Sequence, residues 1–470
     1  MDNKTTRKDH MPRILIAAAA SGSGKTVITS GLLAALKKRN VMPASFKCGP
    51  DYIDPMFHKK VLGVDSLNLD TFFQPADRIR ELVRTCGKDI AVIEGVMGIY
   101  DGVLPAGIEG SCYEIAKITG TPIILIVNAQ GAGRTVASVI KGILFDDDEK
   151  LIRGIILNRM SGSYYEKAAP VLEEEIRKLR DDVSILGYIE KSEKLHIGSR
   201  YLGLTMPGEV NNILDKLDEA ASLIEECCDI PKIIEISESA GDSSPVTAKE
   251  NDKYSVSFNY PANDSKLRLA VARDEAFCFF YEENLRLLGS FGVEPVFFSP
   301  IHDDHIPEGI SGILIGGGYP ELYLQSLCEN VSMRESVKHA IESGMPSLAE
   351  CGGFMYLHDA IEDKNGTAYE TAGVIGGVCK YSGHLVNFGY VEVISSDIIP
   401  ELCGMRGHEF HYYESSAGDS DIVLKKPSTG KEYGSMLASD DHLWGFAHLY
   451  YPSDPDFIRM FSERMREYEN

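Results

Sequence analysis

The stretch Ile14–Thr26 reads ILIAAAASGSGKT and predicts a phosphate-binding loop. Its first three residues form a short apolar run of the kind found in buried parallel strands. Its glycine-rich end, Gly22 to Thr26, is followed by VITSGLLAAL, in which apolar residues recur at helical spacing. A strand, a glycine loop and a helix in this order place backbone N–H groups and the positive end of a helix around phosphate oxygens.

The loop predicts ATP as a ligand and Mg²⁺ as its companion ion. Lys25 is expected to reach the terminal phosphates, and the Thr26 hydroxyl is expected to bind Mg²⁺. The usual pattern has a glycine five residues before Gly24, whereas this chain has Ala19. A small-residue turn without a nucleotide is the alternative interpretation. The residues expected to contact ATP in this loop are Ser21, Gly22, Ser23, Gly24, Lys25 and Thr26.

Composition bounds the class of protein. The chain has 470 residues, enough for two or three domains, and a formal net charge of −23. The negative charge argues against nucleic acid as a partner, because phosphate backbones require a basic surface. No apolar run reaches the roughly 18 residues of a membrane span, and the polar N-terminus shows no secretory signal. The ten cysteines lack metal-site spacing and are expected to be reduced thiols in a cytoplasmic protein.

The first half alternates apolar strands with helices, which predicts a doubly wound parallel sheet in a domain spanning residues 12–229. Residues 1–11 are expected to be a disordered tail. Lys47 and Asp51 follow a short strand, Asp70 ends a loop, and Glu94 ends a buried strand. Ligands of such sheets lie outside the carboxyl ends of the strands. Lys47 and Asp51 are therefore expected to face the group that Lys25 holds, and Glu94 is expected to hold a Mg²⁺-bound water.

The pattern breaks after a helical stretch at residues 208–228. Residues 230–266 become rich in Ser, Asp, Asn and Pro, which predicts an interdomain linker. Strand periodicity restarts at Leu267, so residues 267–470 are expected to form a second α/β domain.

The second domain carries a candidate nucleophile. MPSLAECGGFMYL (residues 345–357) predicts a strand, a sharp turn at Cys351 and a helix, a plan that resembles a nucleophile elbow. The helix N-terminus is expected to lower the pKa of the Cys351 thiol. Backbone N–H groups of Gly317, Gly318 and Gly352 are the expected oxyanion hole. A buried structural cysteine is the alternative.

A thiol nucleophile requires a base, and four histidines are candidates: His408, His411, His442 and His448. His448 is preferred because it closes the apolar run from Leu443 to Ala447.

Motifs from both halves resemble those of the cobyrinic acid a,c-diamide synthases of corrinoid biosynthesis. The resemblance spans nearly the whole chain in family order. The matching runs are SGSGKT, FKCGPDYIDPMFH, NLDTF, IEGVMGIYDG, SRYLGL, DEAFCFFY, GGGYPELY, AECGGFMYL, RGHEFHY and FAHLYY. It implies a dethiobiotin-synthetase-like P-loop domain joined to a flavodoxin-like class I glutamine amidotransferase domain.

The resemblance also implies residue roles. Cys351 would be the glutaminase nucleophile and His448 its base. Thr26, Asp70 and Glu94 would hold Mg²⁺, and Asp51 would lie near the carboxylate being amidated. Many class I amidotransferases have a glutamate two residues after the histidine, whereas this chain has Tyr450. The third group that orients the imidazole is left open.

The implied reaction is ATP- and glutamine-dependent amidation of the a- and c-carboxylates of cobyrinic acid through acyl phosphates. Hydrogenobyrinic acid and nickel sirohydrochlorin are alternative substrates, and cobyric acid synthase is a more distant alternative. A partitioning-type P-loop ATPase switch is an alternative from another class. Such proteins carry a signature lysine at the start of the loop, where this chain has alanines. Candidates for gripping the carboxylate-rich macrocycle are Arg200, Lys380, His384, Arg406 and His408.

Overall fold

The computed structural model describes residues 11–104, 107–191, 210–241, 267–418 and 420–469. The chain divides into two compact units, residues 1–247 and 248–470. Each unit is described here by itself.

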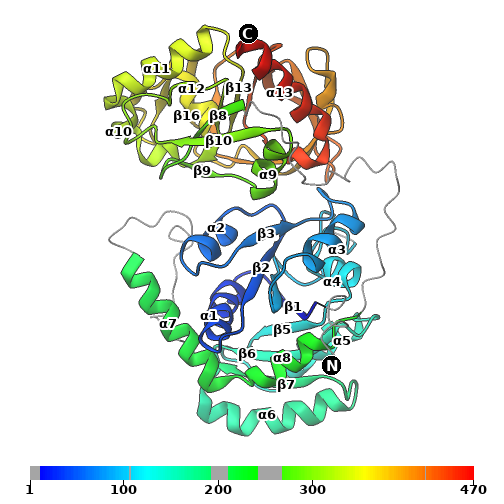
Figure 1. Ribbon diagram of the computed structural model, residues 1–470. Coiled ribbons are helices and arrows are strands. Elements are labelled where there is room, and N and C mark those ends of the chain that lie inside the picture. The colour runs from blue at the N-terminus through cyan, green and yellow to red at the C-terminus, as the bar shows by residue number, and fades with distance from the viewer. Residues whose placement is uncertain (1–10, 105–106, 192–209, 242–266, 419, 470) are drawn as a thin grey trace, which may run out of the picture. The chain divides into compact units, whose positions relative to one another are not determined.

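The first unit is built on seven parallel strands in the order β3-β2-β4-β1-β5-β6-β7 (Figure 1). The order reverses around β1, so the loop after β1 lies at the switch point where such sheets bind ligands. The strands are β1 (Arg13–Ala18), β2 (Pro43–Cys48), β3 (Ser66–Leu69), β4 (Ile90–Glu94), β5 (Ile123–Asn128), β6 (Ile152–Asn158) and β7 (Ser184–Ile189).

Helices cover both faces of this sheet, as a doubly wound fold requires (Figure 1). Side chains alternate between the two cores: Leu15 enters the core under α3 to α6, whereas Ile14 and Ile16 enter the core under α1, α2, α7 and α8. Both faces are thus buried, which is why β1 is apolar along its whole length. The helices are α1 (Lys25–Lys38), α2 (Ile53–Lys60), α3 (Ala76–Arg84), α4 (Cys112–Thr119), α5 (Thr135–Phe145), α6 (Gly162–Arg177), α7 (Val210–Cys227) and α8 (Ile230–Glu238).

The predicted linker is wrong at its start. Residues from Ile230 form α8, whose Ile230, Ile233 and Ile236 are buried in the core of the first unit. Asp229 caps this helix by accepting a hydrogen bond from the Lys232 N–H at 2.9 Å. The polar composition that suggests a linker begins only beyond this helix, and residues 242–266 lie outside the described residues. At the other end, residues 1–10 lie outside them too, and Met11 is buried in the core.

The second unit contains a ten-stranded sheet in the order β10-β8-β11-β13-β22-β21-β20-β17-β18-β23. The strands from β10 to β22 are parallel, and the remaining pairs are antiparallel. The sheet strands are β8 (Leu267–Ala272), β10 (Val293–Phe298), β11 (Gly312–Ile315), β13 (Ser347–Glu350), β17 (Asn387–Ser396), β18 (Arg406–His411), β20 (Ile422–Lys425), β21 (Glu432–Ala438), β22 (His442–Gly445) and β23 (His448–Leu449).

The terminal strand β23 lies near the centre of the sheet, where its Leu449 N–H donates to the side chain of Glu350 at the carboxyl end of β13. Two small sheets and five α-helices complete the described part of this unit, together with three short 3₁₀ helices (Figure 1). These elements are β9 (Phe277–Phe279), β12 (Gly317–Gly318), β14 (His358–Glu362), β15 (Ala368–Glu370), β16 (Ile375–Tyr381), β19 (Tyr413–Ser415), α9 (Glu282–Ser290), α10 (Leu324–Glu329), α11 (Val331–Glu342), α12 (Gly352–Leu357) and α13 (Pro455–Glu469).

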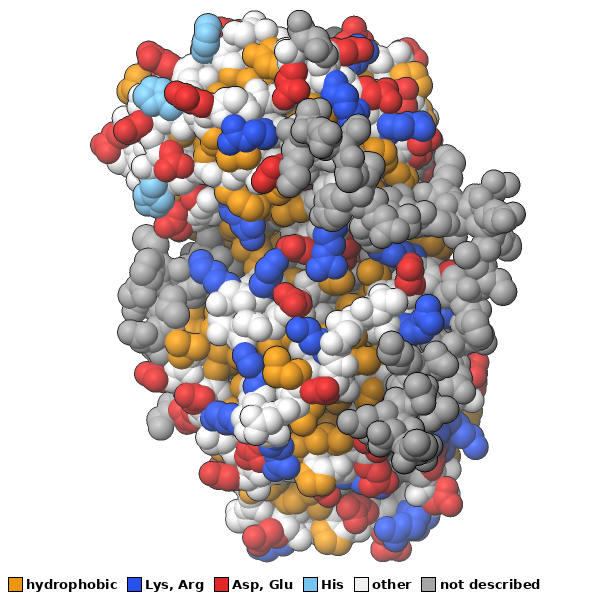
Figure 2. All heavy atoms as spheres, in the orientation of Figure 1, with side chains coloured by type: hydrophobic (Ala, Val, Ile, Leu, Met, Phe, Trp, Pro, Cys, Tyr) orange, Lys and Arg blue, Asp and Glu red, His pale blue; other side chains and the backbone are white. Residues whose placement is uncertain are grey.

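On the face drawn in Figure 2, Asp and Glu side chains are interspersed with Lys and Arg side chains. The helices of the described ranges include none that combines the length and the apolar character needed to cross a bilayer.

Candidate active sites

The phosphate-binding loop has the expected strand–loop–helix frame. Gly24 caps α1 with a φ of 94°, a left-handed conformation that favours glycine. A Cβ at Gly24 would lie 2.3 Å from Nδ2 of Asn158, which itself donates to the Ser23 carbonyl at 2.7 Å. The loop backbone is therefore held from β6, and Gly24 is needed for both conformation and space.

Lys25 is the first residue of α1, and its ammonium lies among backbone carbonyls. Its Nζ donates to the carbonyls of Met97 and Ala20, the latter at 3.4 Å. Burial lowers the pKa of Lys25. Carbonyl groups are weak partners for a buried ammonium, and the phosphates of a nucleotide would be stronger ones.

Three carboxylates surround the buried ammonium of Lys47. Its Nζ is hydrogen-bonded to Asp54, lies 3.0 Å from Glu94 Oε1, and lies 4.0 Å from Asp51 Oδ2. Lys47 and Glu94 lie at the carboxyl ends of the neighbouring strands β2 and β4, where they are paired in register. Asp54 lies in the first turn of α2, and Asp51 precedes that helix. Lys47 is committed to these carboxylates, and its direct contact with ATP stays a prediction.

This cluster carries more negative than positive groups. Burial raises the pKa of Glu94 to about 8 and that of Asp51 to about 6. His58, whose Nε2 lies 3.4 Å from Glu94 Oε2, adds no charge, because burial lowers its pKa to about 4. A divalent cation would favour the charged form of Glu94, so the donor set fits Mg²⁺.

The residues predicted to hold Mg²⁺ are brought only partly together. The Thr26 hydroxyl donates to Glu94 Oε1 at 2.6 Å. Asp70 follows β3 at the same edge of the sheet, where its Oδ1 accepts the Phe72 N–H at 2.8 Å. Within the described part of the chain, no three His, Cys, Asp or Glu side chains cluster as a metal cage. Mg²⁺ at phosphate sites commonly takes one or two carboxylates, with water and phosphate oxygens as its other ligands.

Cys351 occupies the sharp turn that the sequence predicts. It joins β13 to α12 with φ 48° and ψ −103°, a strained conformation for a residue with a side chain. Its N–H donates to the Gly445 carbonyl at 2.7 Å, and the Gly353 N–H donates to the Gly316 carbonyl at 3.0 Å. The turn is thus fastened on both sides, as a nucleophile elbow must be.

The predicted oxyanion-hole glycines lie around this turn. A Cβ at Gly352 would lie 3.1 Å from the backbone N of Gly318, so the two backbones are adjacent. A hydrogen bond from the Gly352 N–H to the Cys351 sulfur acts to lower the pKa of the thiol. A Cβ at Gly317 would lie 2.2 Å from Cε1 of His448, which brings the predicted base to the same corner.

His448 is the histidine that the structure brings to the Cys351 turn. It lies in β23, three residues beyond Gly445, and its ring is stacked on His408 with centroids 4.9 Å apart. Burial, followed by the nearby His408 and His411, lowers the pKa of His448 well below its usual value. His448 is therefore neutral near pH 7, the state in which an imidazole accepts a proton.

The expectation of an acidified thiol is wrong. Burial and then the charge of Glu321 raise the pKa of Cys351 above its usual range, and the Gly352 N–H does not offset them. The short helix α12 is outweighed by desolvation of the thiolate. The raised pKa favours the neutral thiol of Cys351, so any attack by this sulfur would require its proton to leave.

Two carboxyl groups near Cys351 were not predicted: Glu321, which is half-buried, and Glu350, which is buried. Glu321 lies in the turn after Gly318, and burial raises its pKa to about 7. Glu350 immediately precedes Cys351, and its Oε2 lies 4.0 Å from Nδ1 of His448. Both stand inside motifs that are visible in the sequence, GGGYPELY and AECGG, but only the folded chain shows that they face the thiol and the imidazole.

The residues predicted to bind a macrocycle differ in how far their side chains are exposed to solvent. Lys380 is exposed and paired with Glu362 at 2.9 Å, and His384 is exposed. Arg406 is half-buried, whereas His408 is stacked on His448 and hydrogen-bonded through Nδ1 to the Tyr281 hydroxyl at 2.9 Å. His408 thus belongs to the surroundings of the base. Arg200 lies outside the described residues.

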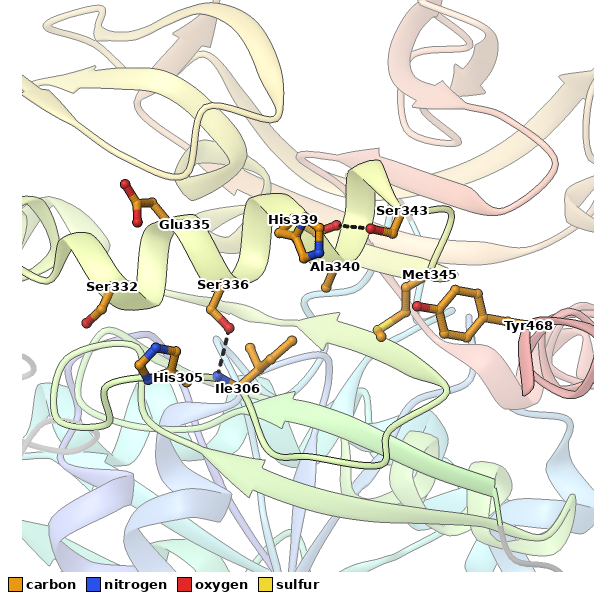
Figure 3. A pocket seen from close by; sticks show the side chains of 10 residues that line it. All are labelled: His305, Ile306, Ser332, Glu335, Ser336, His339, Ala340, Ser343, Met345 and Tyr468. Carbon is orange, nitrogen blue, oxygen red and sulfur yellow. Dashed lines mark hydrogen bonds between the residues drawn. The ribbon is translucent and has the colours of Figure 1, made fainter. Parts of the chain in front are cut away.

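A surface hollow of about 450 Å³ lies beside α11 and contains none of the predicted site residues (Figure 3). His339 and Ser336 line it from α11, His305 and Ile306 from a loop, and Tyr468 from α13. Ser336 accepts the Ile306 N–H at 3.2 Å. The hollow is distinct from the Cys351 turn.

Comparison with known proteins agrees with the two-part plan. Residues 14–201 match the CobQ/CobB/MinD/ParA nucleotide binding domain, and residues 268–447 match the CobB/CobQ-like glutamine amidotransferase domain. A cobyrinate a,c-diamide synthase of Listeria innocua is 37% identical over 97% of this chain and 100% of its own length. Proteins of the same name from Picrophilus torridus and Priestia megaterium are 36% and 35% identical, over 95% and 97% of this chain and 97% of their own lengths.

Proposed function

This chain belongs to the family of cobyrinate a,c-diamide synthases, and we propose that it amidates the a- and c-carboxylates of cobyrinate with ATP and glutamine. One observation carries the proposal. The chain aligns over nearly its whole length with those relatives, and its structure has both a phosphate loop and a cysteine in a strained turn.

The glutaminase half supplies nitrogen. Sγ of Cys351 attacks the side-chain amide of glutamine while its proton passes to His448. Backbone N–H groups of Gly318 and Gly352 stabilise the oxyanion. His448 returns the proton to the leaving nitrogen, ammonia departs, and water hydrolyses the glutamyl thioester to glutamate.

The phosphate-loop half makes the carboxylate reactive. Lys25 binds the terminal phosphates of ATP, and a substrate carboxylate attacks the γ-phosphorus to give an acyl phosphate and ADP. Ammonia then displaces phosphate and leaves an amide. Thr26, Asp70 and Glu94 would hold Mg²⁺, which supplies positive charge to the phosphates. Asp51, partly exposed at the edge of the carboxylate cluster, would lie near the carboxylate being amidated.

The macrocycle is the part of the proposal that needs a direct test. The purified protein is incubated with ATP, Mg²⁺ and glutamine, together with one of three macrocycles: cobyrinate, hydrogenobyrinate or nickel sirohydrochlorin. The masses of the products are measured by mass spectrometry. Cobyrinate is expected to gain two amides with the highest kcat/KM. A higher kcat/KM for either competitor would reassign the substrate. ATP hydrolysis without amidation of any of the three would favour the ATPase switch.

A further inference from the structure

The position that carries a glutamate in many class I amidotransferases holds Tyr450 here, and this tyrosine is committed elsewhere. Its N–H donates to the Arg406 carbonyl at 2.8 Å, and its ring packs edge-on against Tyr281 with centroids 5.5 Å apart. Because a tyrosine carries no carboxylate, a carboxylate that orients the imidazole of His448 must come from another element.

Glu350 is the last residue of β13, far from His448 in the sequence, and it approaches His448 in the folded chain. Its side chain is buried, and its Oε2 lies 4.0 Å from Nδ1 of His448. Its other oxygen, Oε1, accepts the Tyr451 hydroxyl at 2.9 Å and the Leu449 N–H at 3.4 Å. The carboxyl group is thus held by Oε1 and presents Oε2 to the imidazole.

We propose that Glu350 is the positioning residue of the glutaminase and keeps the proton of neutral His448 on Nδ1, so that Nε2 can accept the thiol proton of Cys351. This inference rests on the proposed function of Cys351 and His448. When His448 becomes an imidazolium, the Glu350 carboxylate stabilises the new charge. The 4.0 Å separation has room to shorten when glutamine binds, as catalytic hydrogen bonds commonly do.

His408 cannot take this role. Its ring plane is tilted only 16° from that of His448, so it presents a face rather than an edge to the base. Its Nδ1 is also occupied by the Tyr281 hydroxyl at 2.9 Å. Stacking excludes water from one face of His448, but it does not select a tautomer.

The protonation of Glu350 gives the proposal a pH signature. The groups that face this carboxyl are Cys351 beside it, His448 and the Leu449 N–H of β23, and the Tyr451 hydroxyl. Because Oε1 already accepts two hydrogen bonds, a proton on Glu350 would sit on Oε2 and donate to Nδ1 of His448. That bond would force the proton of the imidazole onto Nε2 and remove the base.

Burial raises the pKa of Glu350 to about 8, so its carboxyl is protonated below that pH and ionised above it. Glutaminase activity should therefore rise with pH through about 8. His448, whose pKa is lowered, acquires its own proton only well below pH 6.5.

Two substitutions separate charge from shape. Glu350→Gln keeps the shape, but its amide NH₂ would face Nδ1 and hold the inactive tautomer. Glu350→Asp keeps the charge on a shorter side chain. Glu342→Gln is the matched control, because Glu342 is an exposed residue of α11 paired only weakly with Lys338 at 3.7 Å. Glutamate release is measured with ATP and cobyrinate present, from pH 6 to 9.5.

We expect Glu350→Gln to lower kcat on the order of 100-fold, with KM for glutamine changed by less than about threefold. The comparable carboxylate-to-amide exchange in a Ser-His-Asp triad lowers kcat by ~10⁴-fold. We expect a smaller loss here, because the 4.0 Å between Glu350 Oε2 and His448 Nδ1 is outside hydrogen-bond range. Glu350→Asp should retain more activity than Glu350→Gln, and the rise through pH 8 should vanish in Glu350→Gln. Tyr451→Phe, which removes one of the two hydrogen bonds that Oε1 of Glu350 accepts, should lower kcat roughly fivefold.

The proposal is overturned if Glu350→Gln is as active as Glu350→Asp, or if it keeps the pH profile of the wild-type protein. A structural role alone would favour the isosteric glutamine. If the wild-type protein and Glu342→Gln release no glutamate, the proposed function fails instead. The two failures are therefore distinguishable.

Discussion

A single methyl group at Gly317 should disable the glutaminase. A Cβ at this position would lie 2.2 Å from Cε1 and 3.0 Å from Nδ1 of His448. An ordinary contact begins near 3.4 Å, so the imidazole and the loop must separate by about 1.2 Å. A misplacement of about 1 Å in a catalytic group costs on the order of 10²-fold, or about 2.7 kcal/mol of transition-state stabilisation.

Neither side of this contact can yield freely. β12 is paired with β9, opposite Phe279, and the preceding Gly316 carbonyl accepts the Gly353 N–H. His448 is stacked on His408 and paired with it in the sheet. The displacement must therefore move the base, the oxyanion loop or both.

The assay compares Gly317→Ala with Gly376→Ala. Gly376 lies in β16, has no atom within 4 Å of a Cβ, and has no left-handed φ, so it controls for the added methyl group. Glutamine hydrolysis, glutamine-dependent amidation and ammonium-dependent amidation are measured for both. Gly317→Ala should lose about 100-fold in the first two and little in the third. A glutaminase kcat/KM within threefold of the Gly376→Ala value would refute the reasoning.

Three further predictions test the two reactive centres. Cys351→Ser should abolish glutamine use and keep amidation with added ammonium; equal loss of both would reject separate sites. Lys25→Ala should lower ATP-dependent amidation by at least about 10³-fold while basal glutamine hydrolysis persists, and normal amidation would reject its role on phosphate. Glu94→Gln should raise the Mg²⁺ concentration for half-maximal ammonium-dependent amidation about tenfold or more, and an unchanged Mg²⁺ dependence would remove Glu94 from the ion's ligands.

The parallel strands buried on both faces were the most predictable part of this fold, for a physical reason. A strand buried on both faces, such as β1, must be apolar along its length, and that run is visible without any tertiary information. The short strands β9 and β12 were not predicted, because β12 consists of two glycines whose pairing with Phe277 and Phe279 depends on the fold. The helix α8 was missed because polar residues beyond it dominated the composition of the segment.

The sites were predictable where a motif fixes backbone geometry and not where long-range packing sets the chemistry. The positions of Lys25 and Cys351 follow from glycine-rich turns after strands. Asp54 was missed as a partner of Lys47, because the six residues between them say nothing about their meeting at the Glu94 carboxylate. The predicted lowering of the Cys351 pKa was wrong, because burial of the thiol depends on neighbours from distant segments. The helix N-terminus, on which the prediction relied, is a local feature.

The neutral state of the thiol and the imidazole explains why positioning should control this glutaminase. Burial raises the pKa of Cys351 and lowers that of His448, and both shifts disfavour a preformed thiolate–imidazolium pair. Proton transfer must then accompany the attack on glutamine, so the orientation and tautomer of the imidazole enter the rate directly. In the proposed mechanism, Gly317 controls the orientation of the imidazole by lacking a side chain, and Glu350 controls its tautomer by its charge. A thiolate formed in advance would make the enzyme far less sensitive to either residue, and the two substitutions measure that sensitivity.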